Sequence, residues 1–164
     1  MDEVYVVLIM EHGYTLLFLL LVIGIIGFPI PDEGILLLAG ALIGKSVLRF
    51  DTTCVISFLA VLSGSLVNYT IARWFGAEVF THWIKRRKWL FRRYVKTLRL
   101  IKKYGAFSIQ ISYFLPGVRM GVSYGAGLLR LPFGQFVSCS IIGIALWVGV
   151  YLYIGKFVGT ALLP

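Results

Sequence analysis

Long apolar runs, separated by short polar or charged stretches, are the main pattern along this sequence. Residues 52–76 and 133–158 are each long enough to cross the hydrocarbon core of a bilayer, which takes about 20 helical residues. Residues 14–28 are uncharged but shorter, so we expect this helix to begin earlier or to tilt little. Residues 4–10 are also apolar, and Glu11-His12-Gly13 interrupts the run. We therefore expect a separate short helix at the N-terminus.

Residues 29–44 cannot form an ordinary spanning helix, although they are mostly apolar. As a helix they would cover about 24 Å, which is short of the ~30 Å hydrocarbon core. Pro29 and Pro31 also lack the backbone N–H that a helix interior needs. The pattern predicts a re-entrant hairpin, which dips into the bilayer and leaves on the side that it entered. Such backbone is tolerated where protein buries it or water reaches it.

A second broken element occupies residues 104–130. An apolar stretch runs into Pro116-Gly117, and three further glycines follow within a dozen positions. This element has the plan of the first, but it carries Arg119 where the first carries the adjacent acids Asp32 and Glu33. The sequence therefore predicts two re-entrant hairpins, one acidic and one basic.

The segment between the two broken elements, residues 77–103, is strongly basic. It holds ten lysines and arginines against the single acid Glu78, and its apolar residues recur at helical spacing. This pattern predicts an amphipathic interfacial helix or helix pair, placed on the cytoplasmic side because basic loops prefer that side. It sets topology and adheres to anionic headgroups, or it gathers an anionic substrate. The interleaved apolar face argues against nucleic-acid binding.

The two broken elements belong to an internal repeat. In the first block, Ala39-Gly40 precedes a long span that ends in Ile71-Ala-Arg-Trp-Phe-Gly76. In the second block, Ala126-Gly127 precedes a span that ends in Ile154-Gly-Lys-Phe-Val-Gly159. If the basic segment stays on one face of the membrane, the hairpins enter from opposite faces. An inverted repeat of this kind is typical of transporters with a site near the midplane.

Composition agrees with a membrane class: 59% of the residues are hydrophobic, the mean hydropathy is +0.90 and the net charge is +9. The acidic start, Met1-Asp2-Glu3, argues against a cleaved secretory signal. Cys54 and Cys139 are predicted to be packing thiols. His12 and His82 are isolated, so we expect no metal site and no cofactor.

These patterns predict an all-α integral membrane protein with one domain, residues 1–164. It consists of repeat one (about 28–76), the basic interfacial segment 77–103 and repeat two (about 104–160). Each repeat joins a re-entrant helical hairpin to a transmembrane helix, and the basic amphipathic helix lies between the repeats.

The charged residues of the hairpins are the candidates for chemistry. A carboxylate inside a membrane costs about 2.5–3.5 kcal/mol on insertion scales, so it is usually paired, hydrated or protonated. Arg119 can grip a phosphate headgroup with its planar fork, while Glu33 pairs with Arg119 in the empty site or carries a proton or cationic group. The alternative is that these charges, Asp32 included, are solvated at the interface.

Glycines of the second hairpin, such as Gly117, are candidates to present backbone N–H groups to a phosphate, or they only permit close packing. Polar side chains of the same hairpin are candidates to line a path for the headgroup, or they are packed or interfacial. They are Tyr113, Tyr124, Gln110, Ser112 and Ser123.

The motifs resemble those of the DedA family, also called the VTT or SNARE-associated membrane family. The resemblance covers about residues 14–160 and is carried by Phe28-Pro-Ile-Pro-Asp-Glu33 and Ala39-Gly40, by Tyr69, Ala72-Arg73 and Gly76, and by Phe114-Leu-Pro-Gly-Val-Arg119, Ala126-Gly127, Phe136, Gly143 and Trp147. It implies a lipid translocase with two opposed re-entrant hairpins. The substrates that it implies are undecaprenyl phosphate or glycerophospholipids such as phosphatidylethanolamine.

Three positions depart from the pattern of many bacterial members. Gly24 stands where they have a glutamate, Tyr113 where they often have an arginine, and Ser65 where many have an aspartate. Fewer charges favour a zwitterionic glycerophospholipid such as phosphatidylethanolamine as the substrate.

The main hypothesis is therefore a flippase or scramblase of the cell membrane that moves a phosphate-containing headgroup and is not an enzyme. The alternatives are an undecaprenyl phosphate translocase of cell-envelope recycling, a membrane-embedded lipid phosphatase, a small-ion transporter and a chaperone without its own substrate. The partners are membrane lipids with an anionic or zwitterionic phosphate headgroup, and the glycine-rich faces are compatible with a homodimer.

Overall fold

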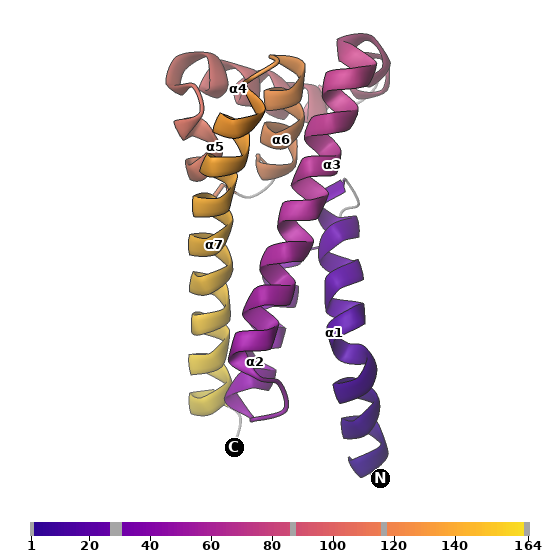
Figure 1. Cartoon of the computed structure of the whole chain (residues 1–164), viewed down its shortest axis with the longest axis vertical. Coiled ribbons are helices and arrows are strands. Elements are labelled where there is room, and N and C mark those ends of the chain that lie inside the picture. Colours follow the sequence, from indigo (N-terminus) through magenta and orange to yellow (C-terminus); the bar gives the residue numbers. More distant parts are fainter. Residues whose placement is uncertain (1, 27–30, 86–87, 116–117, 163–164) are drawn as a thin grey trace. The chain divides into compact units, whose positions relative to one another are not determined.

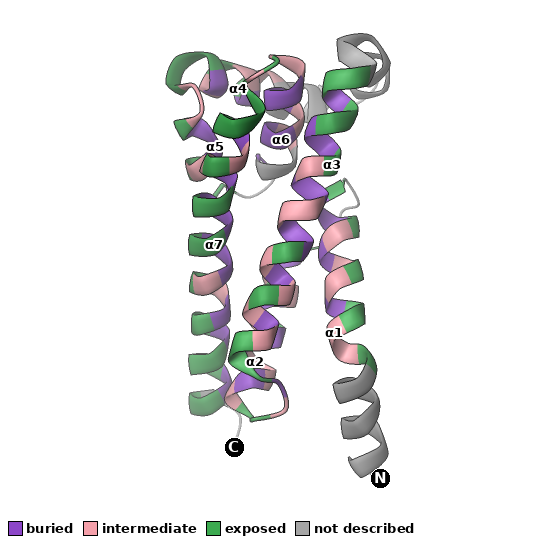
Figure 2. Ribbon diagram, viewed as in Figure 1, coloured by how far each residue is buried: buried purple, intermediate pink, exposed green. Residues whose placement is uncertain are grey.

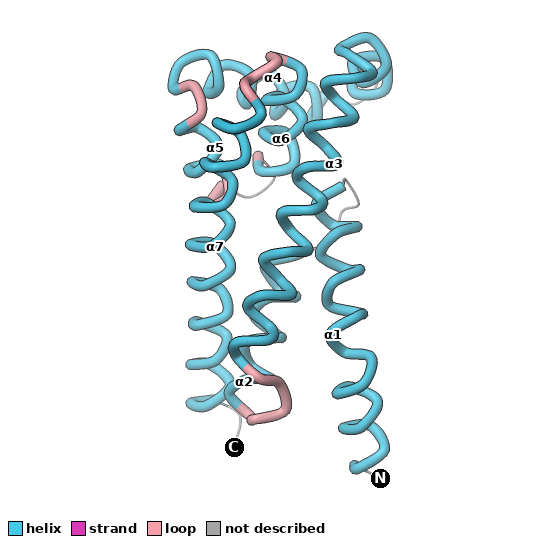
Figure 3. Tube along the Cα trace, viewed as in Figure 1, coloured by secondary structure: helices cyan, strands magenta, loops and turns pink. Residues whose placement is uncertain are grey.

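The computed structural model describes residues 2–26, 31–85, 88–115 and 118–162, and side chains are described for fewer residues than the backbone. Within these ranges all regular structure is helical, and the turns between helices are short (Figure 3). The described helices, labelled in Figure 1, are α1 (Asp2–Ile26), α2 (Asp32–Gly44), α3 (Phe50–Lys85), α4 (Lys88–Tyr104), α5 (Phe107–Ser112), α6 (Arg119–Leu128) and α7 (Phe133–Leu162). The expectation of an all-helical fold is confirmed.

Two of the described helices contain segments long and apolar enough to cross a membrane, Phe50–Trp74 and Phe133–Ala161. They correspond to the two long spans expected from the sequence. The third apolar run, His12–Ile26, is shorter. It belongs to α1, which begins well before it.

The expected break after residue 10 is wrong, because α1 continues through Glu11, His12 and Gly13. Glutamate is a good helix former, histidine is tolerated, and one glycine costs a helix only about 1 kcal/mol. Three such residues without a proline therefore do not end the helix.

The first long span ends at Trp74, close to the expected Gly76, but the helix that contains it, α3, continues to Lys85. The basic segment is thus divided between the end of α3 and α4. Nothing from Ala77 to Lys85 breaks a helix: the stretch has neither proline nor glycine. The residues change from apolar to basic along this part of the chain, but that change does not end the helix.

Contacts divide the chain into two compact units. Unit 1 comprises Met1–Val61 with Ala145–Pro164, and unit 2 comprises Leu62–Ile144. Unit 1 therefore holds α1, α2, the start of α3 and the end of α7. Unit 2 holds the rest of α3, all of α4, α5 and α6, and the start of α7.

In unit 1, α2 packs against the end of α7 through glycines on both helices. A Cβ at Gly40 would lie 2.5 Å from the carbonyl oxygen of Leu152 and 2.8 Å from the Cα of Gly155. One turn further on, a Cβ at Gly44 would lie 2.6 Å from the carbonyl oxygen of Lys156, and Gly159 meets Ala41 in the same way. Small residues spaced four apart let membrane helices approach backbone to backbone. This contact fixes α2 along two turns.

In unit 2, α6 packs on α3 and on α4 in two different ways. Gly127 lies against the main chain of Tyr69, and a Cβ there would also come within 2.8 Å of the Cβ of Ala72. Gly121 and Gly125 instead face side-chain atoms of Thr97, Leu98 and Ile101 on α4. The aromatic core beside them contains Tyr69, which stacks on Phe136 with ring centroids 4.5 Å apart.

The two short helices end in the same way. After α2, Lys45, Ser46 and Val47 donate backbone hydrogen bonds to Ala41, Ile43 and Leu42. After α6, Leu129, Arg130 and Leu131 donate to Gly125, Gly127 and Ala126 in the same pattern. Ser46 and Arg130 both have positive φ, at 59° and 51°. The chain thus leaves α2 and α6 through the same turn before it enters a long helix.

Candidate functional site

The acidic candidates occupy the first two positions of α2. The helix begins directly after Pro31, whose fixed φ suits the start of a helix. Carboxylates are also favoured at this end by the helix dipole. Asp32 is fully buried within unit 1, whereas Glu33 is half-buried. Of the two acids, Asp32 is therefore the one enclosed by protein.

Gly24 of α1 makes the enclosure of Asp32 possible. A Cβ at Gly24 would overlap the carboxylate oxygen Oδ1 of Asp32, and it would lie 2.7 Å from Cγ. The carboxylate therefore fills the space that a side chain at position 24 would need. Sequence reasoning noted the missing acid at Gly24, but it did not connect that absence with Asp32.

The basic candidate, Arg119, is the first residue of α6. Its side chain lies outside the described part of the chain, as does Gly117. The backbone places Arg119 at the N-terminus of α6. Free backbone N–H groups and the helix dipole favour an anion at such an end. Glu33 belongs to unit 1 and Arg119 to unit 2, so their pairing stays a prediction.

Tyr113 lies in a packed position within unit 2. Its side chain is only 2% exposed, and its hydroxyl makes a 3.1 Å hydrogen bond with the hydroxyl of Ser65 on α3. A Cβ at Gly143 on α7 would lie 2.7 Å from the tyrosine ring. Two of the three departures, Tyr113 and Ser65, are therefore direct neighbours and form a neutral pair.

The remaining candidates differ in burial. Ser112 is buried and donates a 2.6 Å hydrogen bond to the carbonyl of Ile109. Ser123 is also buried, whereas Tyr124 and Gln110 are half-buried. Tyr124 and Gln110 thus keep exposed surface for a ligand, while Ser112 is already engaged with the backbone.

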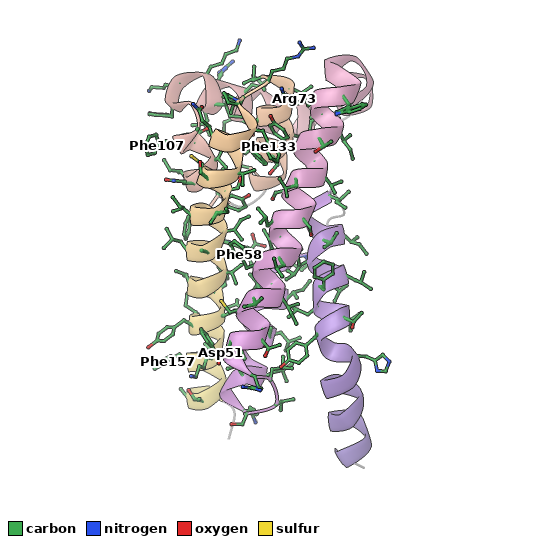
Figure 4. The ribbon with its side chains drawn as sticks, in the orientation of Figure 1. Asp51, Phe58, Arg73, Phe107, Phe133 and Phe157 are labelled. Atoms are coloured by element: carbon green, nitrogen blue, oxygen red, sulfur yellow. The ribbon has the colours of Figure 1, made fainter. Side chains whose placement is uncertain are left out.

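Sequence reasoning missed a cluster at the C-terminal end of α6. The hydroxyl of Tyr69 donates a 2.6 Å hydrogen bond to the carbonyl of Leu131, and the guanidinium of Arg73 donates to the same carbonyl and to the tyrosine oxygen. Figure 4 labels Arg73 and Phe133 in this region, and the Phe133 ring lies 5.8 Å from that of Tyr69. The cluster fixes the turn between α6 and α7.

Unit 1 has a related contact at the corresponding place. The ammonium of Lys156 lies 5.7 Å from the centre of the Phe50 ring. In unit 1 the basic residue thus lies near the end of α7 and the aromatic ring at the start of α3. In unit 2, Arg73 lies over the ring of Tyr69 on its own helix, α3. The signal was present in the sequence, where Arg73 and Lys156 occupy the same place in the repeated motif.

The candidate groups are the acids at the N-terminus of α2 in unit 1 and the arginine at the N-terminus of α6 in unit 2. Among the described residues, no group of three or more His, Cys, Asp and Glu side chains could hold a metal ion. An arginine suits the binding of a phosphate headgroup, because a guanidinium binds phosphate with two parallel hydrogen bonds.

Comparison with known proteins gives three informative matches. Residues 30–157 match the VTT domain. The uncharacterized membrane protein YbfM of Bacillus subtilis is 35% identical over 93% of this chain and 94% of its own length. Protein DedA of Escherichia coli K12 is 33% identical over 93% of this chain and 73% of its own length.

A further match carries a functional name. Undecaprenyl phosphate transporter A of Staphylococcus aureus is 30% identical over 90% of this chain and 74% of its own length. No solved structure matches the chain.

Proposed function

This chain belongs to the VTT domain family of DedA membrane proteins, and on that premise we propose that it carries a phosphate-bearing lipid headgroup across the bilayer. The apolar tails of the lipid stay in the membrane while the head follows a polar path. The observation that carries the proposal is the pair of short helices, each with charged residues at its N-terminus: Asp32 and Glu33 on α2, and Arg119 on α6.

The lengths of these helices support a re-entrant arrangement. With 13 and 10 residues, α2 and α6 extend about 20 and 15 Å at the usual helical rise. Neither crosses a hydrocarbon core of ~30 Å. We propose that they form an inverted repeat, in which the charged N-termini meet near the midplane.

In the proposed mechanism, Arg119 binds the phosphate through its guanidinium fork, and the N-terminus of α6 adds the favourable helix dipole. Glu33 pairs with Arg119 when the site is empty and yields to the phosphate on binding. Asp32, enclosed beside Gly24, places a second carboxyl group next to Glu33 in the sequence. Tyr124 and Gln110 are proposed to line the path, because they retain exposed surface.

A polyprenyl phosphate is the substrate that we propose. The smaller number of charges in the sequence favours phosphatidylethanolamine, but relatives named undecaprenyl phosphate transporter A, at 30% and 28% identity, support the alternative. The burial of Asp32 against Gly24 also makes the case for phosphatidylethanolamine weaker. The carboxylate of Asp32 fills the space of the glutamate that many members have at position 24. Undecaprenyl phosphate is therefore the first substrate to test.

A glycerophospholipid such as phosphatidylethanolamine remains the second candidate because of one observation. Tyr113 and Ser65 form a neutral hydrogen-bonded pair at positions where many relatives are expected to be charged. A site with fewer charges suits a zwitterionic headgroup.

The chain is a membrane protein by its relatives and by its two long apolar helices. We propose the plasma membrane as its location, with the basic segment on the cytoplasmic side. A homodimer stays a prediction.

The test is a leaflet-exposure assay with the whole chain in vesicles, using labelled undecaprenyl phosphate and labelled phosphatidylethanolamine. We expect the wild type to move undecaprenyl phosphate, and Arg119→Ala and Glu33→Ala to abolish this movement while remaining folded. Arg49→Ala removes an exposed arginine from unit 1 and should leave movement unchanged.

Movement of phosphatidylethanolamine alone would replace the proposed substrate by the second candidate. Full activity of both Arg119→Ala and Glu33→Ala would remove the mechanism. Lipid-independent ion flux, or release of phosphate from the lipid, would indicate one of the other functional classes.

A further inference from the structure

The outer face of α4 has no role in the proposed transport path, yet it is the most strongly basic surface among the described side chains. Lys96, Arg99, Lys102 and Lys103 are all exposed. The opposite face of the helix is buried: Thr97 is fully enclosed and Ile101 is 2% exposed. At 3.6 residues per turn, Arg99 and Lys103 point almost directly away from Thr97 and Ile101. The helix is therefore divided into a packed face and a charged face.

The packed face of α4 is held by α6. A Cβ at Gly121 would lie 3.0 Å from the hydroxyl of Thr97, and a Cβ at Gly125 would lie 2.9 Å from the Cδ1 of Ile101. These contacts leave the charged face turned away from α6. They also mean that whatever binds the charged face is linked to α6 through direct contacts.

Exposed aromatic side chains lie at the C-terminal end of the charged face. Tyr104 is 49% exposed, and Lys103 lies 5.0 Å from the centre of its ring. Phe107, the first residue of α5, is 70% exposed and projects at the edge of the ribbon in Figure 4. Aromatic residues gather where hydrocarbon meets headgroups, so basic and aromatic groups together fit a membrane surface better than they fit a soluble polyanion.

We propose that the outer face of α4 binds anionic phospholipid headgroups of the surrounding bilayer, and that this lipid is distinct from the transported one. The occupant follows from charge complementarity: four exposed cations occupy one face of the eight residues 96–103, and that stretch contains no acid. Through Thr97 and Ile101, the bound lipid surface would also hold α6 at a fixed depth. The proposal does not depend on which lipid is transported.

A direct binding measurement tests the proposal without using transport. Purified whole chain in nanodiscs of phosphatidylcholine would be titrated with short-chain phosphatidylglycerol, and binding followed by the rise in the thermal unfolding midpoint. Short-chain phosphatidylcholine and inorganic phosphate serve as the comparison ligands. We expect phosphatidylglycerol to bind at least tenfold more tightly than either, and to bind more weakly in high salt.

The informative variant is Arg99→Gln/Lys103→Gln, which removes two charges from the face without touching the contacts with α6. Each basic residue near an anionic surface contributes roughly a factor of five to affinity, so we expect a loss of about 20- to 30-fold. Lys45→Gln/Arg49→Gln removes two exposed charges from unit 1 and should bind like the wild type.

Equal affinity of the Arg99→Gln/Lys103→Gln variant and the wild type would overturn the proposal. So would equal affinity for phosphatidylcholine, which would indicate general lipid binding, or for inorganic phosphate, which would indicate a site for free anions. A transport-inactive protein that still shows the expected binding would contradict the proposed function alone.

Discussion

The short helices α2 and α6 occupy corresponding places in the two units, but different kinds of neighbour surround them. Both start with the charged residues of the candidate site, and both end in the same turn. Helix α2 meets main-chain atoms of α7 at Gly40 and Gly44, and Asp32 fills the space beside Gly24. Helix α6 meets main chain at Gly127, whereas Gly121 and Gly125 face side-chain ends of α4.

The difference indicates which hairpin can move. Backbone atoms cannot give way without shifting a whole helix, whereas the end of an isoleucine or leucine side chain can rotate to another rotamer. Helix α2 is thus held near its start and along two later turns. Among the glycines of α6, only Gly127 near its end meets main chain, whereas Gly121 and Gly125 meet side chains that can rotate. We infer that α2 is the more rigid of the two helices and that α6 can adjust more easily against α4.

The largest effect is expected for Gly155→Ala in unit 1. The new methyl group would overlap the carbonyl oxygen of Leu37 and lie 2.9 Å from the Cα of Gly40. Overpacking typically costs about 1–3 kcal/mol, and we expect at least the upper end here because main chain lies on both sides. The measurement is the thermal unfolding midpoint in detergent. A midpoint within error of the wild type would contradict the rigid contact.

A smaller loss is expected for Gly24→Ala, whose methyl group would displace the carboxylate of Asp32. We expect a stability loss of about 1–3 kcal/mol and reduced lipid movement. The swap variant Gly24→Asp/Asp32→Ala removes the clash and returns a carboxylate to the same space from α1. It should recover stability and part of the movement. If the swap is no better than Gly24→Ala alone, the carboxylate does not act from that space.

Gly125→Ala in unit 2 should cost less than about 1 kcal/mol, because the contacted Cδ1 of Ile101 can shift and alanine favours the helix. Adding Ile101→Val removes that Cδ1 atom. In a double-mutant cycle on the unfolding midpoint, the pair should cost less than the sum of the single changes, by about 0.5 kcal/mol or more. Additive losses would show that the two residues do not meet as described.

The smallest effect is expected for Gly149→Ala on α7, which serves as the control for the other glycine changes. Nothing lies within 4 Å of the position that its Cβ would take. Helix propensity then favours alanine by up to about 1 kcal/mol. We expect an unchanged or slightly raised unfolding midpoint. A large drop would indicate that this face of α7 contacts another molecule.

Helix breaks and long apolar runs were predictable because local residues determine them. Pro31 and the charges around it place the start of α2, and the apolar runs place the spans in α3 and α7. The errors came from weak signals: glycines such as Gly13 and Gly76, without a proline beside them, do not end a helix. Figure 2 shows that α7 has one exposed and one buried side, which apolar composition alone does not reveal because both sides are apolar.

The candidate site was predictable in composition but not in contacts. Adjacent acids point about 100° apart on a helix, so only one of them can face α1. Gly24 selects Asp32, and no local pattern shows this. The pairing of Tyr113 with Ser65 joins positions 48 residues apart, which periodicity cannot reveal. The spacing of Gly40 with Gly44 and of Gly155 with Gly159 was a usable signal for close helix packing.

The central claim, that the acidic and basic hairpins form one site, is tested most directly by cross-linking between positions 33 and 119. In a background with Cys54→Ser and Cys139→Ser, Glu33→Cys/Arg119→Cys would be treated in vesicles with a short bifunctional thiol reagent, and the joined peptides identified by mass spectrometry. The matched control is Glu33→Cys/Lys96→Cys. We expect rapid joining of 33 with 119 and little joining of 33 with 96. Equal or slower joining of 33 with 119 than in the control would contradict a shared site.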